Sequence, residues 1–320
     1  MRHIITGGSG FTGRCLASFL VRRGDEVVLF DRRPPTFDHR AIYIPGDATV
    51  ASDLDRLGLR PGDVVYHLAA RQFADAVPRL NRTAWFEAVN VEGTRQVLSA
   101  MARSGANKLV FFSTDMTYGV PQSTPVTPSH PQRPIGPYGT SKMHAEALIR
   151  ATRKEGIAAT IFRPRLITGA GRLGILERLF RLIRRGLPVP LIGGGNNRYQ
   201  MVSVQDCVTA AVRAVDRGCP PGPFNLGSAS PPTTRMLLGA VIRHANSRSV
   251  LLPISAAPLK ATLAALDFAG LTLMYPEQFG IADLDILLDT STTRSELDWE
   301  PSIDDIAAMN AAYDIFVAKA

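Results

Sequence analysis

A tyrosine and a lysine four residues apart form the pair in this sequence best suited to proton transfer. Tyr138 and Lys142 share one face of an expected helix, because positions i and i+4 lie one turn apart. A phenol with a pKa of about 10 is a poor base at neutral pH, but a neighbouring ammonium group stabilises the phenolate. Thr114 can hydrogen-bond the same substrate oxygen and orient it. We predict that these three residues are catalytic.

A glycine-rich loop near the N-terminus predicts where a nucleotide would bind. It reads Thr6-Gly7-Gly8-Ser9-Gly10-Phe11-Thr12-Gly13 and directly follows the apolar Ile4-Ile5. Gly7 permits a sharp turn off a strand, Gly10 lets the backbone approach a pyrophosphate, and Gly13 lets the next helix pack closely. The N-terminus of that helix offers N–H groups to the phosphates. The predicted dinucleotide-binding residues here are Gly7, Gly10, Phe11, Thr12 and Gly13.

An acidic residue follows the loop at the distance that selects between nicotinamide cofactors. Asp31 ends an expected strand at residues 27–30, about 20 residues beyond the glycines. Its carboxylate can accept hydrogen bonds from the adenosine ribose and would repel a 2′-phosphate, so NAD is favoured over NADP. Arg32 and Arg33 could pair with a 2′-phosphate if Asp31 turned away, or could simply form a solvated loop. We count Arg32 among the cofactor-binding candidates.

The order of apolar segments predicts an α/β fold, a doubly wound parallel-sheet Rossmann domain with a smaller α/β C-terminal substrate lobe. Further strands are expected at residues 41–44, 64–70 and 108–112. Ligand-binding atoms should lie at the carboxyl ends of such strands. We assign residues 1–168 to the Rossmann domain, with 206–227 returning to it, and 169–320 to the smaller lobe. The length of 320 residues exceeds what one core supports.

The net charge of +8 does not by itself indicate nucleic-acid binding, because no known binding module accompanies it. One dense basic group lies on an expected amphipathic helix, with Arg178, Arg181, Arg184 and Arg185 opposite Leu179 and Leu182. These arginines would solvate an outer face or attract a phosphorylated substrate.

Cysteine usage and hydropathy suggest a cytoplasmic protein. Cys15, Cys207 and Cys219 are widely spaced and lack histidines at ligand spacing, so neither disulfides nor a metal site is expected. No leader sequence and no apolar run of membrane-spanning length is recognised. The apolar stretch 258–274, which Lys260 and Asp267 interrupt, is expected to be a core or lid helix; contact with an apolar substrate or a membrane surface is the alternative.

An ordered set of motifs along nearly the whole chain resembles the extended short-chain dehydrogenase/reductase family, which includes epimerases, dehydratases and reductases of sugar nucleotides and 3β-hydroxysteroid dehydrogenase-like enzymes. Besides the glycine loop, Asp31 and the Tyr138–Lys142 pair, the motifs are Gly46-Asp47, His67-Leu68-Ala69-Ala70, Asn90, Ser113-Thr114-Asp115-Met116-Thr117-Tyr118-Gly119, Arg163-Pro164, Phe224-Asn225-Leu226-Gly227 and Leu297-Asp298-Trp299-Glu300-Pro301.

The resemblance implies roles for further residues. Asp47 and Ala48 would lie beside the adenine, Leu68, Ala69 and Ala70 would line the cofactor cleft, Lys142 would bond the nicotinamide ribose, and Pro164 would lie near the carboxamide. Asn90 would contact the cofactor or tie backbone groups together. His67 is expected to be a packed strand residue, and a homodimer is a family expectation.

Departures from the family pattern affect the expected substrate and reaction. Met116 occupies the position of the acidic residue that dehydratases use, and a thioether cannot remove a proton. Leu166 replaces an asparagine that holds the substrate diphosphate in sugar-nucleotide enzymes, so Arg165 or Arg198 would have to substitute. Asp115 could accept a substrate hydroxyl or cap a turn. The candidate substrate-binding residues are therefore Asp115, Met116, Arg165 and Arg198.

Three functions are compatible with these residues. The first is an NAD-dependent epimerase or related oxidoreductase acting on an activated, phosphorylated sugar such as a nucleotide sugar, through a transient ketone. The second is a secondary-alcohol dehydrogenase or ketoreductase of the 3β-hydroxysteroid dehydrogenase type with an apolar substrate. The third is a cofactor sensor without turnover, which the retention of both Tyr138 and Lys142 disfavours.

Overall fold

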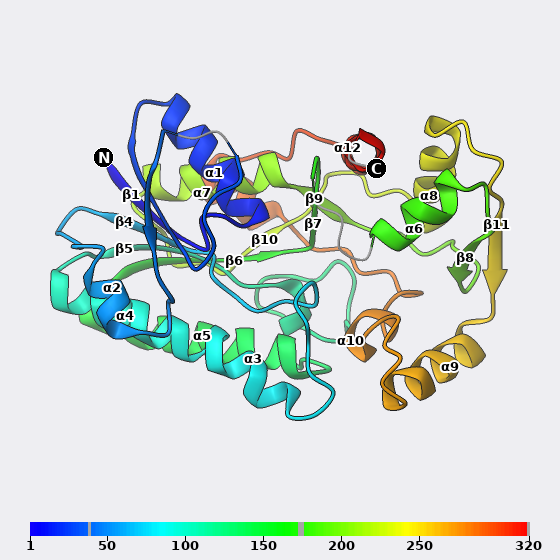
Figure 1. Ribbon diagram of the computed structural model, residues 1–320, viewed down its shortest axis with the longest axis horizontal. Helices are drawn as coiled ribbons and strands as arrows, with labels where there is room; N and C mark the ends of the chain where they lie inside the picture. The colour runs from blue at the N-terminus through cyan, green and yellow to red at the C-terminus, as the bar shows by residue number, and fades with distance from the viewer. Residues whose placement is uncertain (38–39, 172–175, 319–320) are drawn as a thin grey trace.

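A seven-stranded parallel sheet forms the centre of the larger lobe (Figure 1). The computed structural model describes residues 1–37, 40–171 and 176–318. The strand order is β10-β6-β5-β4-β1-β2-β3. The strands are β1 (Arg2–Thr6), β2 (Glu26–Asp31), β3 (Ile42–Pro45), β4 (Val64–His67), β5 (Lys108–Phe112), β6 (Ala158–Pro164) and β10 (Phe224–Leu226). The chain reverses its direction of winding between β1 and β4, which is where doubly wound sheets bind ligands. The predicted fold class is confirmed.

Helices cover both faces of this sheet. One face carries α1 (Phe11–Arg22), α7 (Val204–Asp216) and α11 (Ser291–Leu297), and the other carries α2 (Ala51–Asp55), α3 (Arg82–Asn90), α4 (Glu92–Ser104) and α5 (Pro137–Thr152). The central strands are apolar on both sides, as buried parallel strands must be. Two separate cores result, one around Leu16, Leu20 and Val208 and the other around Met101 and Ile149.

The strand expected at residues 64–70 ends three residues earlier, at His67. Leu68 still donates its N–H to the carbonyl of Thr6. Beyond it the chain leaves the sheet, and the backbone of Ala69 packs against Gly7 of the glycine loop. His67 is buried, with Nδ1 2.7 Å from Oγ1 of Thr6 and Nε2 3.1 Å from Oγ1 of Thr94. Burial lowers the pKa of His67 to about 3, so the imidazole is neutral at physiological pH.

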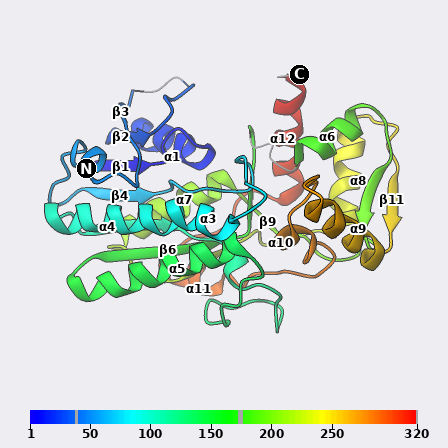
Figure 2. The ribbon, with the colours of Figure 1, turned by 60° about the horizontal axis from the view of Figure 1, so that its bottom comes forward.

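The smaller lobe lies beside the carboxyl ends of the strands (Figure 2). It contains α6 (Leu176–Arg184), α8 (Thr234–His244), α9 (Ala256–Phe268), α10 (Pro276–Phe279) and α12 (Asp305–Ala318), with a parallel pair formed by β8 (Val189–Ile192) and β11 (Leu251–Ile254). A second short pair, β7 (Leu166–Thr168) with β9 (Met201–Ser203), connects the two lobes. Residues 204–226 return to the larger lobe as α7 and β10, where β10 pairs with β6.

The described part of the chain bears on three of the compositional expectations. No helix in it is long and apolar enough to span a bilayer. It contains no cluster of His, Cys, Asp and Glu side chains arranged to hold a metal ion. Cys15, Cys207 and Cys219 are free thiols.

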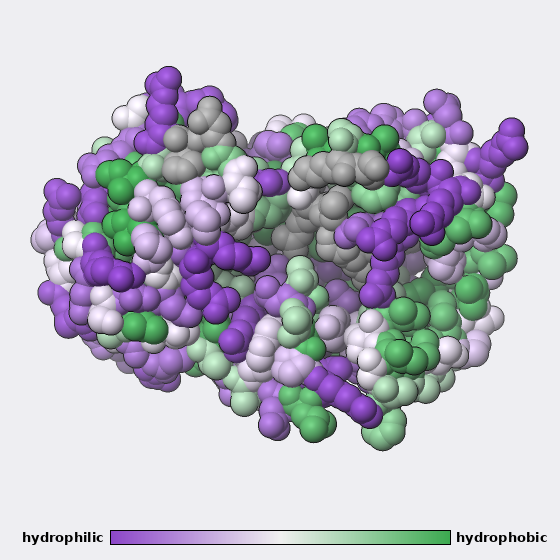
Figure 3. Space-filling model, viewed as in Figure 1, coloured by the Kyte–Doolittle hydropathy of each residue, from purple (hydrophilic) through white to green (hydrophobic). Residues whose placement is uncertain are grey.

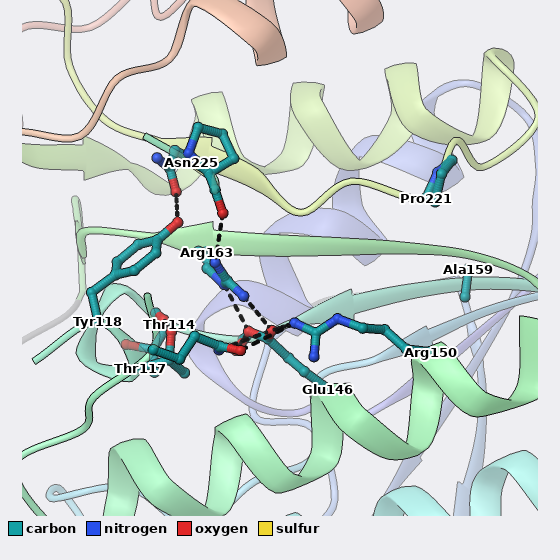
Figure 4. Close-up of polar contacts among 12 residues, drawn as sticks. Thr114, Thr117, Tyr118, Glu146, Arg150, Ala159, Arg163, Pro221 and Asn225 are labelled. Atoms are coloured by element: carbon teal, nitrogen blue, oxygen red, sulfur yellow. Dashed lines mark hydrogen bonds and ion pairs between the residues drawn. The ribbon is translucent and has the colours of Figure 1, made fainter. Parts of the chain in front are cut away.

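A buried carboxylate fixes α5 against the sheet (Figure 4). Glu146 accepts hydrogen bonds from Nε (2.9 Å) and Nη2 (2.6 Å) of Arg163 on β6 and from Oγ of Ser113 (2.5 Å) at the end of β5. Arg150 completes the ion-pair cluster. The Arg163 guanidinium also lies over the ring of Tyr118, whose hydroxyl donates to Oδ1 of Asn225 on β10 at 2.6 Å. This polar network, the Glu146 network, joins α5 to three neighbouring strands.

Replacing Glu146 by Gln should destabilise the protein by about 3–5 kcal/mol, because the buried Arg163 guanidinium would lose its counter-charge. Urea unfolding at pH 7 measures the change. The double variant Glu146→Gln/Arg163→Met should recover part of that loss, since the unpaired charge is removed as well. A loss below about 1 kcal/mol in the single variant would show that the pair does not hold α5.

Candidate active site

The glycine loop lies at the reversal point of the sheet and has the shape of a phosphate cradle. Gly7 has φ +72°, and a Cβ there would lie 2.7 Å from the backbone nitrogen of Ala69 after β4. A Cβ at Gly13 would lie 2.4 Å from the carbonyl oxygen of Gly7. No side chain caps α1 at its N-cap, Gly10. The backbone therefore fits only glycine at two of the three positions, and the N-terminus of α1 is left for an anion.

Asp31 stands at the carboxyl end of β2, next to this loop. Its two carboxylate oxygens each accept a backbone N–H at 3.1 Å, one from Ser9 in the loop and one from Arg33. The exposed Arg32 guanidinium approaches Asp47 at 3.6 Å instead of forming an ion pair with Asp31. Asp47 itself accepts the N–H and hydroxyl of Thr49. Asp31 and Asp47 thus place two carboxylates beside the loop, an arrangement that suits ribose hydroxyls and disfavours a 2′-phosphate.

The three predicted catalytic residues come from two neighbouring elements at the same edge of the sheet. Tyr138 and Lys142 occupy the first two turns of α5 and are both buried. Thr114 follows β5, and its hydroxyl accepts the N–H of Met116 at 3.2 Å, which starts a short 3₁₀ turn. Ser113, one residue earlier, is bonded to Glu146, so the Glu146 network holds both elements.

Lys142 is held in an environment that disfavours its charge. Its Nζ lies 4.1 Å from the centroid of the Phe111 ring, and the side chain is buried. Burial lowers the pKa of Lys142 to about 7, although the carboxylate of Glu146 one turn later acts in the opposite direction. The ammonium group is therefore present only in part at neutral pH.

Aromatic rings surround Tyr138. Phe73 packs edge-on at 5.1 Å between ring centroids and Phe86 lies at 5.6 Å. Tyr275, from the smaller lobe, stacks on Phe73 at 4.8 Å. These rings keep water away from one side of the phenol, which strengthens its electrostatic interactions.

Glu277 is a site residue that sequence reasoning missed. It belongs to α10 in the smaller lobe, yet its carboxylate accepts the N–H of Tyr138 (3.1 Å) and of Gly139 (3.2 Å), so it caps α5 at the predicted catalytic tyrosine. Burial raises the pKa of Glu277. Gly136 makes room for this contact, because a Cβ there would lie 2.5 Å from Cγ of Glu277. The only sequence signal is Gly136-Pro137, a helix start with no acidic residue in its first turn. Such a helix N-terminus is stabilised by an anion from another part of the chain.

The four candidate substrate residues do not gather in one place. Arg165 donates to Asp115 at 2.8 Å, and this ion pair is buried. Met116, partly buried beside it, lines a small hollow together with Asp115 and Glu277. Arg198 is exposed and lines a separate cavity of about 430 Å³ with Asp304 and Asp305. The geometry favours a structural partnership between Asp115 and Arg165.

The remaining cofactor candidates lie along the same edge of the sheet. Asn90 is buried; its side chain bonds the backbone of Arg71 in both directions and donates to Oγ of Ser141 at 2.9 Å, which fits the interpretation that it ties backbone groups together. The others are Ala48 after β3, Leu68, Ala69 and Ala70 after β4, Pro164 at the end of β6, and Phe11 and Thr12 in the first turn of α1.

The residues present fit a dinucleotide. The cradle at Gly7 and Gly13 closes if a side chain is added, the adjoining helix N-terminus has no side-chain cap, and Asp31 is placed beside it for a ribose. Tyr138, Lys142 and Thr114 line the same strand edge further along the sheet.

Comparison with known proteins agrees with this geometry. A model of the NAD dependent epimerase/dehydratase family matches residues 3–227. An uncharacterized protein of Sinorhizobium fredii is 32% identical over 321 residues, covering 99% of this chain and 78% of its own length. The UDP-glucose 4-epimerase of Streptomyces lividans is 34% identical over 155 residues, but the match covers only 46% of each chain. The crystal structure of a UDP-glucose 4-epimerase from Thermotoga maritima with UDP-glucose superposes with a TM-score of 0.81 at 22% identity, over 100% of this chain and 99% of that one.

Lys142→Met should change stability in a pH-dependent way. Since the folded-state pKa of about 7 lies below the unfolded value of about 10.4, the unfolded chain binds more protons between these limits and wild-type stability rises with pH. The variant lacks this group, so its advantage over the wild type should be largest below pH 7 and should shrink towards pH 10. Urea unfolding at pH 6, 7.5 and 9 tests this; a pH-independent difference would refute the depressed pKa.

Asp31→Ala should weaken the preference for NAD over NADP. Loss of two carboxylate acceptors and of the repulsion of a 2′-phosphate should reduce the ratio of the two dissociation constants about tenfold. Calorimetric titration with each nucleotide measures it. Asp55→Ala, which removes an exposed carboxylate of α2 that pairs with Arg103, serves as control, and an unchanged ratio in Asp31→Ala would exclude a ribose contact.

Proposed function

Because this chain belongs to the NAD dependent epimerase/dehydratase family, we propose that it is an NAD-dependent 4-epimerase of a nucleotide sugar. The family match confirms the resemblance to extended short-chain dehydrogenases/reductases, and with it an NAD-dependent enzyme. The UDP-glucose 4-epimerases among its relatives and structural neighbours support the sugar-nucleotide substrate and the position of the reacting carbon.

One arrangement carries the proposal: a tyrosine and a lysine share the buried face of a helix at the carboxyl edge of a dinucleotide-binding sheet. Bound NAD supplies the acceptor and donor of hydride at the sugar carbon. Tyr138 takes the proton of the sugar hydroxyl as the ketone forms and returns it when the alcohol of opposite configuration is made. Thr114 bonds the same oxygen and fixes its position. Lys142 stabilises the phenolate by its charge.

Two side chains argue against a dehydratase reaction. Met116 follows Asp115, and the Asp115 carboxylate is committed to Arg165. Neither side chain is placed to act as the acid–base pair of a water elimination. Return of hydride to the same carbon, which Tyr138 and Thr114 suffice to assist, is the reaction that these residues support best.

Tyr138→Phe should lower kcat for the conversion of UDP-glucose to UDP-galactose by about 10²–10⁴ while NAD stays bound, because only the proton acceptor is lost. Tyr313→Phe, a tyrosine in the core of the smaller lobe, is the matched control and should leave kcat unchanged. Coupled detection of UDP-galactose measures the rate. Stoichiometric release of NADH by the wild type would instead support a secondary-alcohol dehydrogenase, and full activity of Tyr138→Phe would end the assignment.

A further inference from the structure

Helix α9 turns its two charged residues inward and leaves its exposed face uncharged, which is unusual for a surface helix. Its charged residues point inward: Lys260 donates to the carbonyl of Gly280 at 2.8 Å and pairs with Asp283, and Asp267 forms a two-point ion pair with Arg82 of α3, both bonds 2.8 Å. Surface helices usually turn their charges outward and bury an apolar stripe. The exposed positions of α9 are uncharged; they are Ala257, Pro258, Ala261, Thr262, Ala264, Ala265 and Phe268. The helix expected to belong to the core or a lid therefore presents an apolar face to its surroundings.

Large apolar side chains continue this face beyond the helix. Phe268 is 83% exposed, Leu271 65% and Leu273 51%. The loop that carries them is fixed by two guanidinium groups: Nη2 of Arg79 donates to the carbonyl of Phe268 at 2.7 Å, and Nη1 of Arg178 donates to the carbonyl of Leu273 at 2.6 Å. These two hydrogen bonds fix the backbone of the loop, and its apolar side chains are left exposed to solvent.

Positive charge borders this apolar face. Within the described ranges, Arg79 and Arg178, which bind the backbone of this loop, are exposed and form no ion pair. Figure 3 shows hydrophobic residues gathered over α9 and strongly hydrophilic ones over the neighbouring α6, which carries Arg178 and Arg184. The sequence as a whole carries a net charge of +8. We define the α9 surface as the exposed face of α9 with Phe268, Leu271 and Leu273, bordered by Arg79 and Arg178.

We propose that the α9 surface binds the face of an anionic lipid bilayer. A phenyl ring and leucines beside arginines are the composition that enters the region between headgroups and acyl chains, while the arginines contact lipid phosphates. A nucleic acid would offer the phosphates without an apolar layer. A second copy of this chain, joined through a two-fold axis, would bring two positively charged faces together, and the exposed positions of α9 carry no carboxylate to pair with the arginines.

This surface is joined directly to the active site. Arg82, which holds Asp267 of α9, also lies over the ring of Tyr275 at 5.3 Å, and Tyr275 stacks on Phe73 beside Tyr138. A bilayer bound at the α9 surface would therefore be connected to the proposed acid–base residue through α9 itself and the successive contacts of Arg82, Tyr275 and Phe73.

Co-sedimentation with vesicles tests the proposal without reference to catalysis. The full chain should pellet with vesicles of phosphatidylcholine and phosphatidylglycerol, and 0.5 M NaCl or vesicles of phosphatidylcholine alone should reduce binding about tenfold or more. Phe268→Asp/Leu271→Asp should reduce binding to the anionic vesicles by a similar factor. Ile42→Asp/Val120→Asp, two exposed apolar positions on the larger lobe that receive the same charge change, should bind like the wild type.

Circular dichroism and NAD binding establish that both double variants remain folded. Absence of binding to anionic vesicles, or equal binding by Phe268→Asp/Leu271→Asp, would overturn the proposal. So would sedimentation velocity showing a wild-type dimer that this variant alone dissociates, since the α9 surface would then be a contact between copies. Loss of epimerase activity with intact vesicle binding would bear on the proposed function only.

Discussion

The position of helix α5, which carries Tyr138 and Lys142, depends on one buried carboxylate. Glu146 has no exposure to water, and an isolated charge there would be strongly unfavourable, so its ion pair with Arg163 and its bond from Ser113 hold α5, β5 and β6 in one arrangement. Because Ser113 precedes Thr114 and α5 carries Tyr138, the same carboxylate sets the relative position of the hydroxyl and the phenol that we propose act on one substrate atom. A structural ion pair thereby determines the geometry of the proposed chemistry.

Glu146 also acts on the charge of Lys142, which lies one turn earlier on the same face of α5. Lys142 packs over the Phe111 ring, and burial is the larger influence on its pKa. The attraction of Glu146 favours the charged form but is the smaller of the two influences, so it does not restore the ordinary pKa. The pKa of Lys142 is therefore about 7, and a bound ligand that brings negative charge would favour the protonated form.

The local part of this arrangement could be predicted from sequence, since turn geometry and helical periodicity act over a few residues. Gly7 forms a turn with φ +72° and Gly13 packs against the carbonyl of Gly7, while the pairing of Tyr138 with Lys142 follows from a spacing of four. The partners of these residues could not be predicted. Glu277 reaches α5 across 139 positions of the chain, and the pairing of Asp115 with Arg165 depends on how β6 leaves the sheet. For α9, the sequence showed an apolar segment with two charges, but not that Lys260 and Asp267 would both find partners inside.

Contacts between the lobes connect the smaller lobe to the helix that carries Tyr138. Glu277 binds the N–H groups of Tyr138 and Gly139, while Arg82 on α3 binds Asp267 on α9. Each contact uses a charged side chain of one lobe and a defined partner of the other, so both contacts are lost if the lobes separate. The smaller lobe thus caps the very turn of α5 that carries the phenol. A change in how that lobe sits would act first on these contacts at the N-terminus of α5, in the turn that carries Tyr138.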